Sequence, residues 1–323
     1  MKSKLLYGVV GVGHLGNFHV QQIQKNSRIE LGGVFDTNTK QSKAIAKKYN
    51  THSFKTNVEL YKTCDVVSIV TPAPFHYQEA MLGLSHGCHL FIEKPFTTLL
   101  EDAEEIISLA NKKDLLIQIG HIERFNPVFK KFEGIQKNPL FIESQRLSPF
   151  NIRGSDIDVI LDLMIHDIDL ILHLVQQNVS DVRAAGVSVL SSSYDLVNAR
   201  LGFDNGSVAN LTASRLSASP LRKMRIFEKN QYYSLNFQKL KIKHYVTQNK
   251  KTSEKTVFNH NNKYVVYKEL QAEPINALYE ELDSFILSIY KNIPIKVSKE
   301  VGRDVLKIAL QIKNKIDEQK KQN

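Results

Sequence analysis

The first 120 residues alternate between short apolar runs and longer segments whose apolar residues recur at helical spacing. The apolar runs are rich in β-branched residues, as in strands that are buried on both faces of a parallel sheet. Regular alternation of strand and helix is typical of a mostly parallel, doubly wound sheet. The predicted strands are 5–12, 29–35, 65–70, 89–93 and 115–119, and the predicted helices are 17–25, 40–49, 75–86 and 100–112. The pattern therefore predicts an α/β domain over residues 1–121.

The pattern changes after residue 121. One long apolar helix is predicted over residues 159–175, and strands separated by turn signals follow from residue 182. The run Asp204-Asn205-Gly206-Ser207 is a strong hairpin signal. These features predict a C-terminal α+β domain over residues 122–298, with an open, mainly antiparallel sheet whose uncovered face forms an oligomer interface. Residues 249–262 are predicted as a polar loop, and a last helix, 299–316, is predicted to pack back on the first domain.

A glycine-rich turn joins the first predicted strand to the first predicted helix. Its G-x-G-x-x-G spacing permits a tight turn and a close approach of the backbone to a pyrophosphate, which the amide groups of the helix N-terminus can bind. The next strand ends at Asp36, twenty residues after the last glycine, where a carboxylate can bind ribose hydroxyls and repel a 2′-phosphate. The turn therefore favours NAD over NADP, and the alternative is a structural turn followed by an unrelated aspartate. The candidate cofactor contacts in the turn are Gly11, Gly13, His14, Leu15 and Gly16.

Two later strand ends carry further candidate residues, because ligands bind at the carboxyl edge of an open α/β sheet. Thr71, Pro72 and His76 follow one strand and are candidates for the nicotinamide side of the site. His76 could equally be an ordinary residue of the next helix. Glu93 and Lys94, before Pro95, end another strand, and a lysine there can hydrogen-bond a substrate hydroxyl. The alternative is that both are the solvated end of a strand.

The apolar helix predicted over residues 159–175 carries three polar side chains. Asp162 and His166 are four residues apart and are predicted to share a face with Asp169. Polar groups on an apolar helix are costly to bury without a partner, and an aspartate beside an imidazole orients it and raises its basicity. The alternatives are a self-satisfied Asp-His pair or a metal site. No further His, Cys or Glu cluster has matching spacing, so no metal is expected.

Three motifs in this order, G-x-G-x-x-G, Glu93-Lys94-Pro95 and Asp162-x-x-x-His166-x-x-Asp169, make the chain resemble the Gfo/Idh/MocA oxidoreductase family. The resemblance covers nearly the whole chain. It implies a Rossmann domain with an open-faced second domain, NAD(P) dependence and a sugar or polyol substrate. It also implies that Lys94 and His166 are the catalytic pair and that Asp162 assists the histidine.

A narrower resemblance rests on residues 120–127, 146–150 and 156–169. These stretches are similar to enzymes that oxidise the 3-hydroxyl of UDP-N-acetylglucosamine or its uronate, including those that precede a 3-amino transfer in lipid A pathways. The likeness implies an aminotransferase as a pathway partner. Arginine can hold phosphate through two hydrogen bonds, so Arg124 and Arg146, with Asn126, are candidate substrate contacts beside Lys94, Asp162 and His166.

The formal net charge of +10 leaves nucleic acid or membrane binding open, but no nucleic-acid-binding motif accompanies the lysines, and a phosphate-bearing substrate fits the charge. We expect no membrane span and no signal peptide, and the two cysteines fit a reducing cytoplasm. The expected assembly is a homodimer or homotetramer. Two alternatives stay open: a dehydrogenase for an unphosphorylated sugar or polyol such as inositol or glucose, and a non-catalytic NAD-binding regulatory protein.

Overall fold

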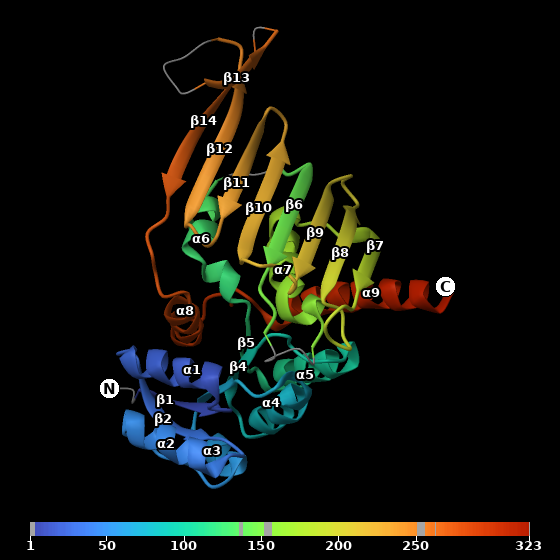
Figure 1. The fold of residues 1–323 in the computed structure, drawn as a ribbon. Coiled ribbons are helices and arrows are strands. Elements are labelled where there is room, and N and C mark those ends of the chain that lie inside the picture. Colours follow the sequence, from blue (N-terminus) through green and yellow to red (C-terminus); the bar gives the residue numbers. More distant parts are fainter. Residues whose placement is uncertain (1–3, 136–137, 152–156, 251–255, 262, 323) are drawn as a thin grey trace. The chain divides into compact units, whose positions relative to one another are not determined.

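The computed structural model describes residues 4–135, 138–151, 157–250, 256–261 and 263–322 (Figure 1). Its contacts form two compact units: Met1–Ile122 with Asn276–Leu306, and Glu123–Ile275 with Lys307–Asn323. Residues 276–298 therefore belong to the first unit, whereas the sequence pattern predicted them in the second domain. The last helix, α9 (Lys299–Gln322), contributes its first residues to the first unit and the rest to the second.

The first unit contains a five-stranded parallel sheet in the order β2-β1-β3-β4-β5. The strands are β1 (Leu5–Val10), β2 (Ile29–Phe35), β3 (Val66–Ile69), β4 (His89–Glu93) and β5 (Ile117–Gly120). The helices are α1 (His14–Lys25), α2 (Thr39–Tyr49), α3 (Asn57–Thr63), α4 (His76–Ser85), α5 (Leu100–Lys113) and α8 (Ala277–Lys291), with a 3₁₀ turn at Ala73–Phe75. This confirms the predicted doubly wound sheet; the short helix α3 was missed.

Helices cover both faces of this sheet because successive residues of a strand point to opposite faces. In β1, Tyr7 and Val9 are fully buried in a core that includes side chains of α1 and α8. Gly8, between them, faces Leu60 of α3. A strand that is buried on both faces has to be apolar throughout, which explains the continuous apolar runs of the first domain.

The second unit contains a nine-stranded sheet in the order β13-β14-β12-β11-β10-β6-β9-β8-β7. Among the described strand pairs of this nine-stranded sheet, only β6–β9 is parallel, so the prediction of a mainly antiparallel sheet is confirmed. Its strands are β6 (Phe141–Leu147), β7 (Val179–Val187), β8 (Leu196–Phe203), β9 (Val208–Ser214), β10 (Leu221–Glu228), β11 (Gln231–Asn236), β12 (Lys241–Gln248), β13 (Thr256–His260) and β14 (Lys263–Gln271). The loop predicted over residues 249–262 is wrong for 256–260, which form β13; residues 251–255 and 262 lie outside the described residues.

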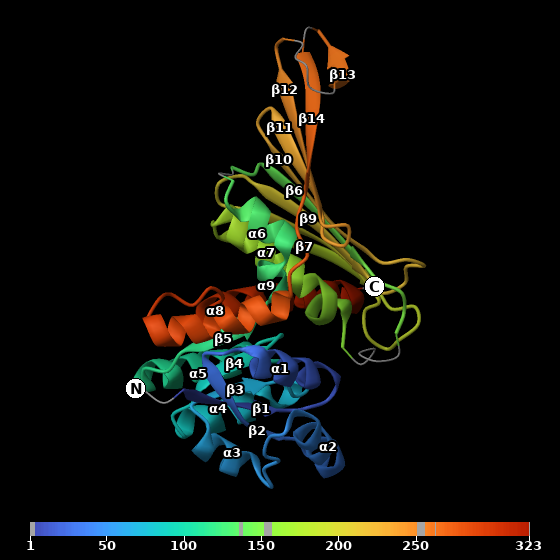
Figure 2. The same cartoon turned by 90° about the vertical axis from the view of Figure 1, so that its left-hand side faces the viewer.

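Helices α6 (Pro127–Glu133) and α7 (Ile165–Val175) pack on one face of this sheet (Figure 2). A 3₁₀ turn, Ile122–Phe125, precedes α6, and a π-helical turn, Ile160–Met164, leads directly into α7. In β6, Ile142, Ser144 and Arg146 are buried while the residues between them are only half-buried. The other face of the sheet is therefore left uncovered by the described residues of this unit.

A row of aromatic side chains crosses five neighbouring strands on this open face. Each residue is the direct cross-strand partner of the next, and the ring centroids lie between 4.2 and 6.0 Å apart. Aromatic cross-strand pairs stabilise a sheet and fix its register. The row consists of Phe141, Phe227, Tyr232, Tyr245 and Tyr267.

Candidate active site

The three glycines of the turn after β1 have different surroundings. Gly11 has a φ of +85°, and a Cβ on Gly16 would lie 1.9 Å from the carbonyl oxygen of Gly11. Both positions therefore require glycine for the turn itself. Gly13 is the N-cap of α1, and a Cβ there would meet nothing within 4 Å. Open space above a helix N-terminus is what the diphosphate of a dinucleotide needs, so the turn fits NAD.

Asp36 follows β2 and hydrogen-bonds the backbone of the glycine turn. Its Oδ2 accepts a hydrogen bond from the amide of Val12 at 2.8 Å, and its Oδ1 accepts one from the amide of Asn38 at 2.8 Å. A carboxylate oxygen accepts more than one hydrogen bond, so Asp36 keeps capacity for ribose hydroxyls. His14 and Leu15 lie exposed in the first turn of α1. The structure thus brings the predicted cofactor residues of the first two strand ends together.

His76 does not line a surface, because it is buried under the loops that follow β3 and β4. Its Nε2 lies 2.9 Å from the carbonyl oxygen of Thr71, and its Nδ1 lies 2.9 Å from the carbonyl oxygen of Pro95. Burial lowers the pKa of His76, and the two carbonyl groups oppose part of that shift. Pro72 is exposed, and the Lys94–Pro95 peptide is cis. The imidazole therefore bridges the two loops that carry the other candidate residues, and direct contact of His76 with NAD stays a prediction.

Glu93 is buried at the end of β4 and is bound on both sides. His19 of α1 places Nε2 2.9 Å from Oε1, and the amide of Lys94 donates to Oε2 at 3.2 Å. Burial alone would raise the pKa of Glu93, but the His19 hydrogen bond and the charge of Lys94 lower it below its usual value. Lys94 itself is half-buried. Glu93 therefore fixes the backbone from which the lysine side chain projects.

His19 was missed by the sequence reasoning. The available signal was a histidine on the inner face of α1, three residues after Gly16, in a helix whose other inward side chains include Val20 and Ile23. A polar group at such a position needs a buried partner. The sequence did not show which residue that partner is.

In the second unit, Asp162 lies in the π-helical turn and His166 in the first turn of α7, and both are half-buried. π-helical turns inside helices occur frequently at functional sites. Asp169 is fully buried instead and pairs with Arg124, so it differs from the other two in exposure, and the common face of all three residues stays a prediction. Asp156, at the start of the stretch 156–169, lies outside the described residues.

Arg124 and Arg146 are each 3% exposed and bind carboxylates of α7 through two parallel hydrogen bonds. Arg124 pairs with Asp169 at 2.7 and 2.8 Å, and Arg146 pairs with Asp167 at 3.0 and 2.9 Å. Arg146 also donates to Glu123 at 2.8 Å, and the two carboxylates raise its pKa further even though burial alone would lower it. These contacts tie α7 to the start of the unit and to the sheet.

Asn126 completes this cluster. It caps α6 by accepting from the amide of Val128 and donates to Glu123 at 3.0 Å. Arg222 of β10 was missed by the sequence reasoning; its side chain is 52% exposed, and its Nη1 lies 3.6 Å from Glu123 Oε1. The predicted substrate contacts Arg124 and Arg146 therefore have buried ionic partners, and Arg222 is the exposed arginine beside them.

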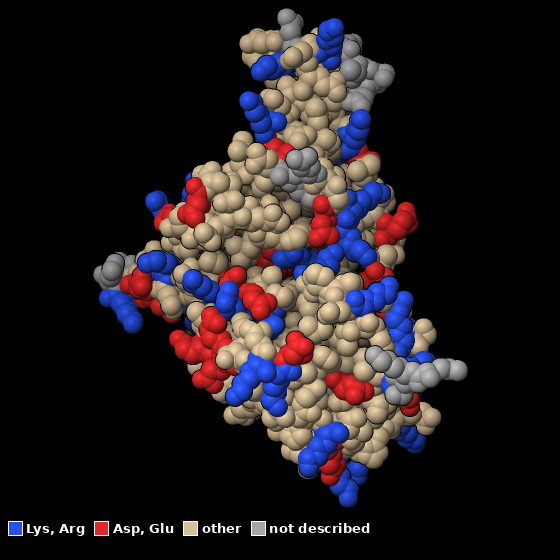
Figure 3. Space-filling model, turned by 180° about the vertical axis from the view of Figure 1, so that it is seen from behind, with Lys and Arg blue, Asp and Glu red and all other residues tan. Residues whose placement is uncertain are grey.

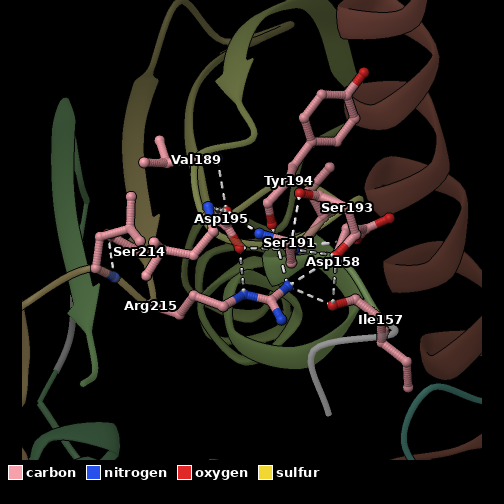
Figure 4. Close-up of polar contacts among 12 residues, drawn as sticks. Ile157, Asp158, Val189, Ser191, Ser193, Tyr194, Asp195, Ser214 and Arg215 are labelled. Carbon is pink, nitrogen blue, oxygen red and sulfur yellow. Dashed lines mark hydrogen bonds and ion pairs between the residues drawn. The ribbon is translucent and has the colours of Figure 1, made fainter. Parts of the chain in front are cut away.

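A second buried polar cluster holds the chain before the π-helical turn (Figure 4). Asp195 accepts from the amides of Val189, Leu190 and Ser191 at 2.7, 2.7 and 3.0 Å, and Arg215 pairs with it at 3.4 Å. Burial alone would raise the pKa of Asp195, but hydrogen bonds from the Ser191 hydroxyl and from the three backbone amides hold it far below its usual value. The Asp195 contacts therefore fix the loop between β7 and β8 against the end of β9.

Arg215 and Asp158 extend this cluster to the start of the π-helical turn. Arg215 donates to the carbonyl oxygens of Tyr194, at 3.1 Å, and of Ile157. Asp158 accepts from the amides of Ile160 and Leu161 at 3.2 and 3.1 Å. The position of Asp162 is thus determined by residues far away in the sequence.

On the face in Figure 3, lysine and arginine side chains are interspersed with acidic ones. Within the part of the chain that the structure describes, no helix has the length and apolar character to cross a bilayer. The same residues contain no group of three His, Cys, Asp or Glu side chains placed to hold a metal ion.

A parallel sheet with a glycine turn after its first strand, an aspartate after its second and a lysine at its carboxyl edge is typical of a nicotinamide-dependent oxidoreductase. The comparisons with known proteins agree with this class. Residues 5–121 match the model of an oxidoreductase family with an NAD-binding Rossmann fold, and residues 141–231 match the GFO/IDH/MocA C-terminal domain. The chain therefore belongs to the Gfo/Idh/MocA family and is an NAD-binding oxidoreductase.

Two relatives illustrate the range of similarity within curated proteins. The chain is 38% identical over 309 residues to UDP-N-acetylglucosamine 3-dehydrogenase of Acidithiobacillus ferrooxidans, covering 95% of each chain. It is 23% identical over 239 residues to scyllo-inositol 2-dehydrogenase of Bacillus subtilis, covering 67% of this chain and 69% of that one. A solved structure of the Acidithiobacillus enzyme superposes with a TM-score of 0.89 at 35% identity, covering 97% of this chain and 98% of that one.

Proposed function

We propose that this protein transfers a hydride to NAD from carbon 3 of a UDP-N-acetylglucosamine-type nucleotide sugar. The observation that carries the proposal is the likeness to a UDP-N-acetylglucosamine 3-dehydrogenase over 95% of both chains. The likeness to the inositol dehydrogenase is weaker and covers only two thirds of this chain. The substrate unit as well as the cofactor unit therefore resembles the nucleotide-sugar enzyme.

Lys94 and His166 are the proposed catalytic residues. His166 takes the proton of the sugar hydroxyl as the carbon loses its hydride, and Lys94 hydrogen-bonds the same oxygen and stabilises its developing negative charge. Asp162 orients the imidazole of His166. NAD supplies the hydride acceptor when it is bound, and the residues of this chain position the two reactants.

The sequence predicted Arg124, Asn126 and Arg146 as substrate contacts. Their contacts within the protein support a different role, in which they position the residues around the substrate. Both arginines bind buried carboxylates, so they hold α7 and Glu123 in place. Arg222, half-exposed beside Glu123, is the arginine of this cluster that can grip a diphosphate.

A substrate panel tests this function. The purified protein is incubated with NAD and UDP-N-acetylglucosamine, its uronate, free N-acetylglucosamine, glucose or inositol, and NADH is followed by fluorescence. A 3-aminotransferase with an amino acid as amino donor converts the 3-keto product to the 3-amino sugar and releases the 2-oxo acid, and the sugar is identified by mass. Turnover confined to the UDP-sugars, with a 3-keto or 3-amino product, is expected. Turnover of inositol or glucose without a 3-keto nucleotide sugar would establish the polyol alternative.

A non-catalytic regulatory protein is expected to have lost Lys94 or His166, and both are present. NAD binding without turnover of any sugar in the panel would favour that alternative nevertheless. Measuring NAD binding together with turnover of the panel therefore distinguishes an enzyme from a protein that only binds NAD.

The cellular setting is also a proposal. A 3-keto nucleotide sugar is a substrate for amino transfer, so we place the enzyme before a 3-aminotransferase in cytoplasmic lipid A synthesis. The open sheet face with its aromatic row is proposed as the contact of a homodimer or homotetramer. Light scattering of Tyr232→Lys against the unchanged protein tests the contact, and a smaller assembly is expected for the variant.

A further inference from the structure

Four buried polar side chains form a continuous chain of hydrogen bonds through the core of the first unit. Tyr7 OH lies 3.0 Å from Ser68 Oγ, and Ser68 Oγ lies 3.3 Å from His19 Nδ1. His19 Nε2 lies 2.9 Å from Glu93 Oε1. Tyr7, Ser68 and His19 are 0% exposed, and Glu93 is 9% exposed. These hydrogen bonds thus link β1, β3, α1 and β4, and Tyr7, at the inner end of the series, does not reach solvent.

Which group donates in each hydrogen bond follows from the protonation states of Glu93 and Tyr7, the two ends of the series. The carboxylate of Glu93 accepts from the amide of Lys94 and from His19, because the pKa of Glu93 is lowered below its usual value and the ionised group only accepts. With the proton on Nε2, His19 Nδ1 accepts from the Ser68 hydroxyl. Ser68 Oγ in turn accepts from Tyr7, whose hydroxyl keeps its proton because burial raises its pKa. Every member then has a partner of the correct kind.

The backbone leaves room for this carboxylate at one position. A Cβ on Gly120 of β5 would lie 3.0 Å from Glu93 Cδ and 3.0 Å from Oε2. That distance is shorter than ordinary contacts between carbon atoms, so a larger residue at position 120 would press on Glu93. The glycine at position 120 of β5 thus leaves room for the Glu93 carboxylate in the position where it binds His19.

We propose that His19 is a positioning residue for the catalytic lysine, acting through Glu93. This inference rests on the proposed function of Lys94. Its structural basis is that Glu93 binds the Lys94 amide with one oxygen and His19 with the other, so the imidazole sets the orientation of the group that holds the lysine backbone. His19 also belongs to α1, the helix that begins at the glycine turn. The pair therefore connects the helix at the cofactor diphosphate with the strand end that carries the lysine.

The competing explanation is that His19 merely fills the core. A core role and a positioning role predict different kinetics, since loss of packing weakens α1 and the glycine turn, whereas loss of positioning leaves cofactor binding intact. His19→Leu removes both ring nitrogens at similar volume. His19→Gln retains an N–H donor close to the place of Nε2 and can still bind Glu93.

A matched control separates stability from positioning. Asn26 caps the other end of α1, is buried, and donates to Asp283 at 2.7 Å without touching Glu93. Asn26→Ala therefore weakens the same helix away from the lysine. Lys94→Ala is the reference for loss of the catalytic group.

The experiment measures kcat with UDP-N-acetylglucosamine and the dissociation constant of NAD by calorimetry for the full-length variants. His19→Leu is expected to lower kcat by about tenfold to 100-fold, the scale of one charge-assisted hydrogen bond, with NAD affinity within about threefold of the unchanged protein. His19→Gln should recover most of that loss, and Asn26→Ala should lower the melting temperature with little change in kcat. Unchanged kcat in His19→Leu, or equal loss of kcat and NAD affinity in His19→Leu and Asn26→Ala, would overturn the proposal.

A crystal structure of His19→Leu with NAD provides a readout that does not depend on the substrate. We expect the Glu93 carboxylate to turn away from the Lys94 amide, and an unchanged Glu93–Lys94 contact would overturn the proposal. If the unchanged protein does not oxidise UDP-N-acetylglucosamine, the proposed function fails, and this structure alone decides the role of His19.

Discussion

Arg124 and Asp169 form an ion pair inside the second unit, with Nε 2.7 Å from Oδ2 and Nη2 2.8 Å from Oδ1. The side chains are 3% and 0% exposed, so neither group retains much contact with water. An ion pair in such a place contributes little net stability, but each partner strongly needs the other. The pair joins the segment before α6 to α7, the helix of His166.

Removing one partner of this pair is expected to destabilise the protein by about 3–5 kcal/mol, because an unpaired charge is left buried. The variants Arg124→Met and Asp169→Leu test this in urea unfolding at neutral pH. The double variant should recover much of the loss, since two apolar side chains can replace the pair. If both single variants unfold like the unchanged protein, the pair is not formed in solution.

The same double variant examines whether Arg124 contacts the substrate. With a positioning role, the KM for UDP-N-acetylglucosamine should stay within about threefold, because a difference below about 0.7 kcal/mol is less than one hydrogen bond. Arg222→Met is the matched variant on the exposed arginine. It is expected to raise KM about tenfold or more, and the opposite ranking would restore Arg124 as the phosphate contact.

Two glycines of the same turn should respond differently to alanine. Gly16→Ala places a Cβ against the carbonyl of Gly11 and should cost at least about 2 kcal/mol of stability. Gly13→Ala meets no atom and has an ordinary φ of −64°, so it should fold normally, but its methyl group occupies the space of the diphosphate. NAD affinity by calorimetry should fall about tenfold or more, and normal affinity in Gly13→Ala would contradict the assigned cofactor site.

Lys94→Ala and His166→Ala should each lower kcat by about two to four orders of magnitude, the usual contribution of a proton-transferring side chain. NAD binding should persist in both variants, which controls for unfolding. Near-normal turnover in either variant would remove that residue from the catalytic pair.

Acid should destabilise the protein in two stages. The pKa of His76 is lowered by burial, so below its ordinary value of about 6.5 the unfolded chain takes up a proton that the folded protein refuses. The pKa values of Glu93 and Glu123 are also lowered against the effect of burial, so a second loss begins near their ordinary value of about 4.3 and grows as pH falls. Urea unfolding at pH 7.5, 5.5 and 4 should show both stages. Constant stability from pH 7.5 to 5.5 would contradict the environment found for His76.

The sequence could predict the first domain because each of its signals is local. An apolar run, a glycine turn and an acid at the next strand end lie within a few dozen residues, and β1, α1 and Asp36 are placed accordingly. The partners of Asp169 and His19 could not be predicted, since a buried polar residue on a helix shows that a partner exists without showing which one. Arg124 lies 45 residues from Asp169, and Glu93 lies 74 residues from His19. The π-helical turn was equally hidden, because its sequence keeps the apolar pattern of an α-helix.

Transfer of deuterium from carbon 3 tests the central claim most directly. UDP-N-acetylglucosamine that carries deuterium only at carbon 3 is incubated with the protein and NAD, and the reduced cofactor is analysed by mass spectrometry. A hydride taken from that carbon must appear in the cofactor, so the reduced NAD should be one mass unit heavier than with unlabelled sugar. Reduced cofactor without deuterium, or no reduction while another sugar is oxidised, would contradict the proposed reaction.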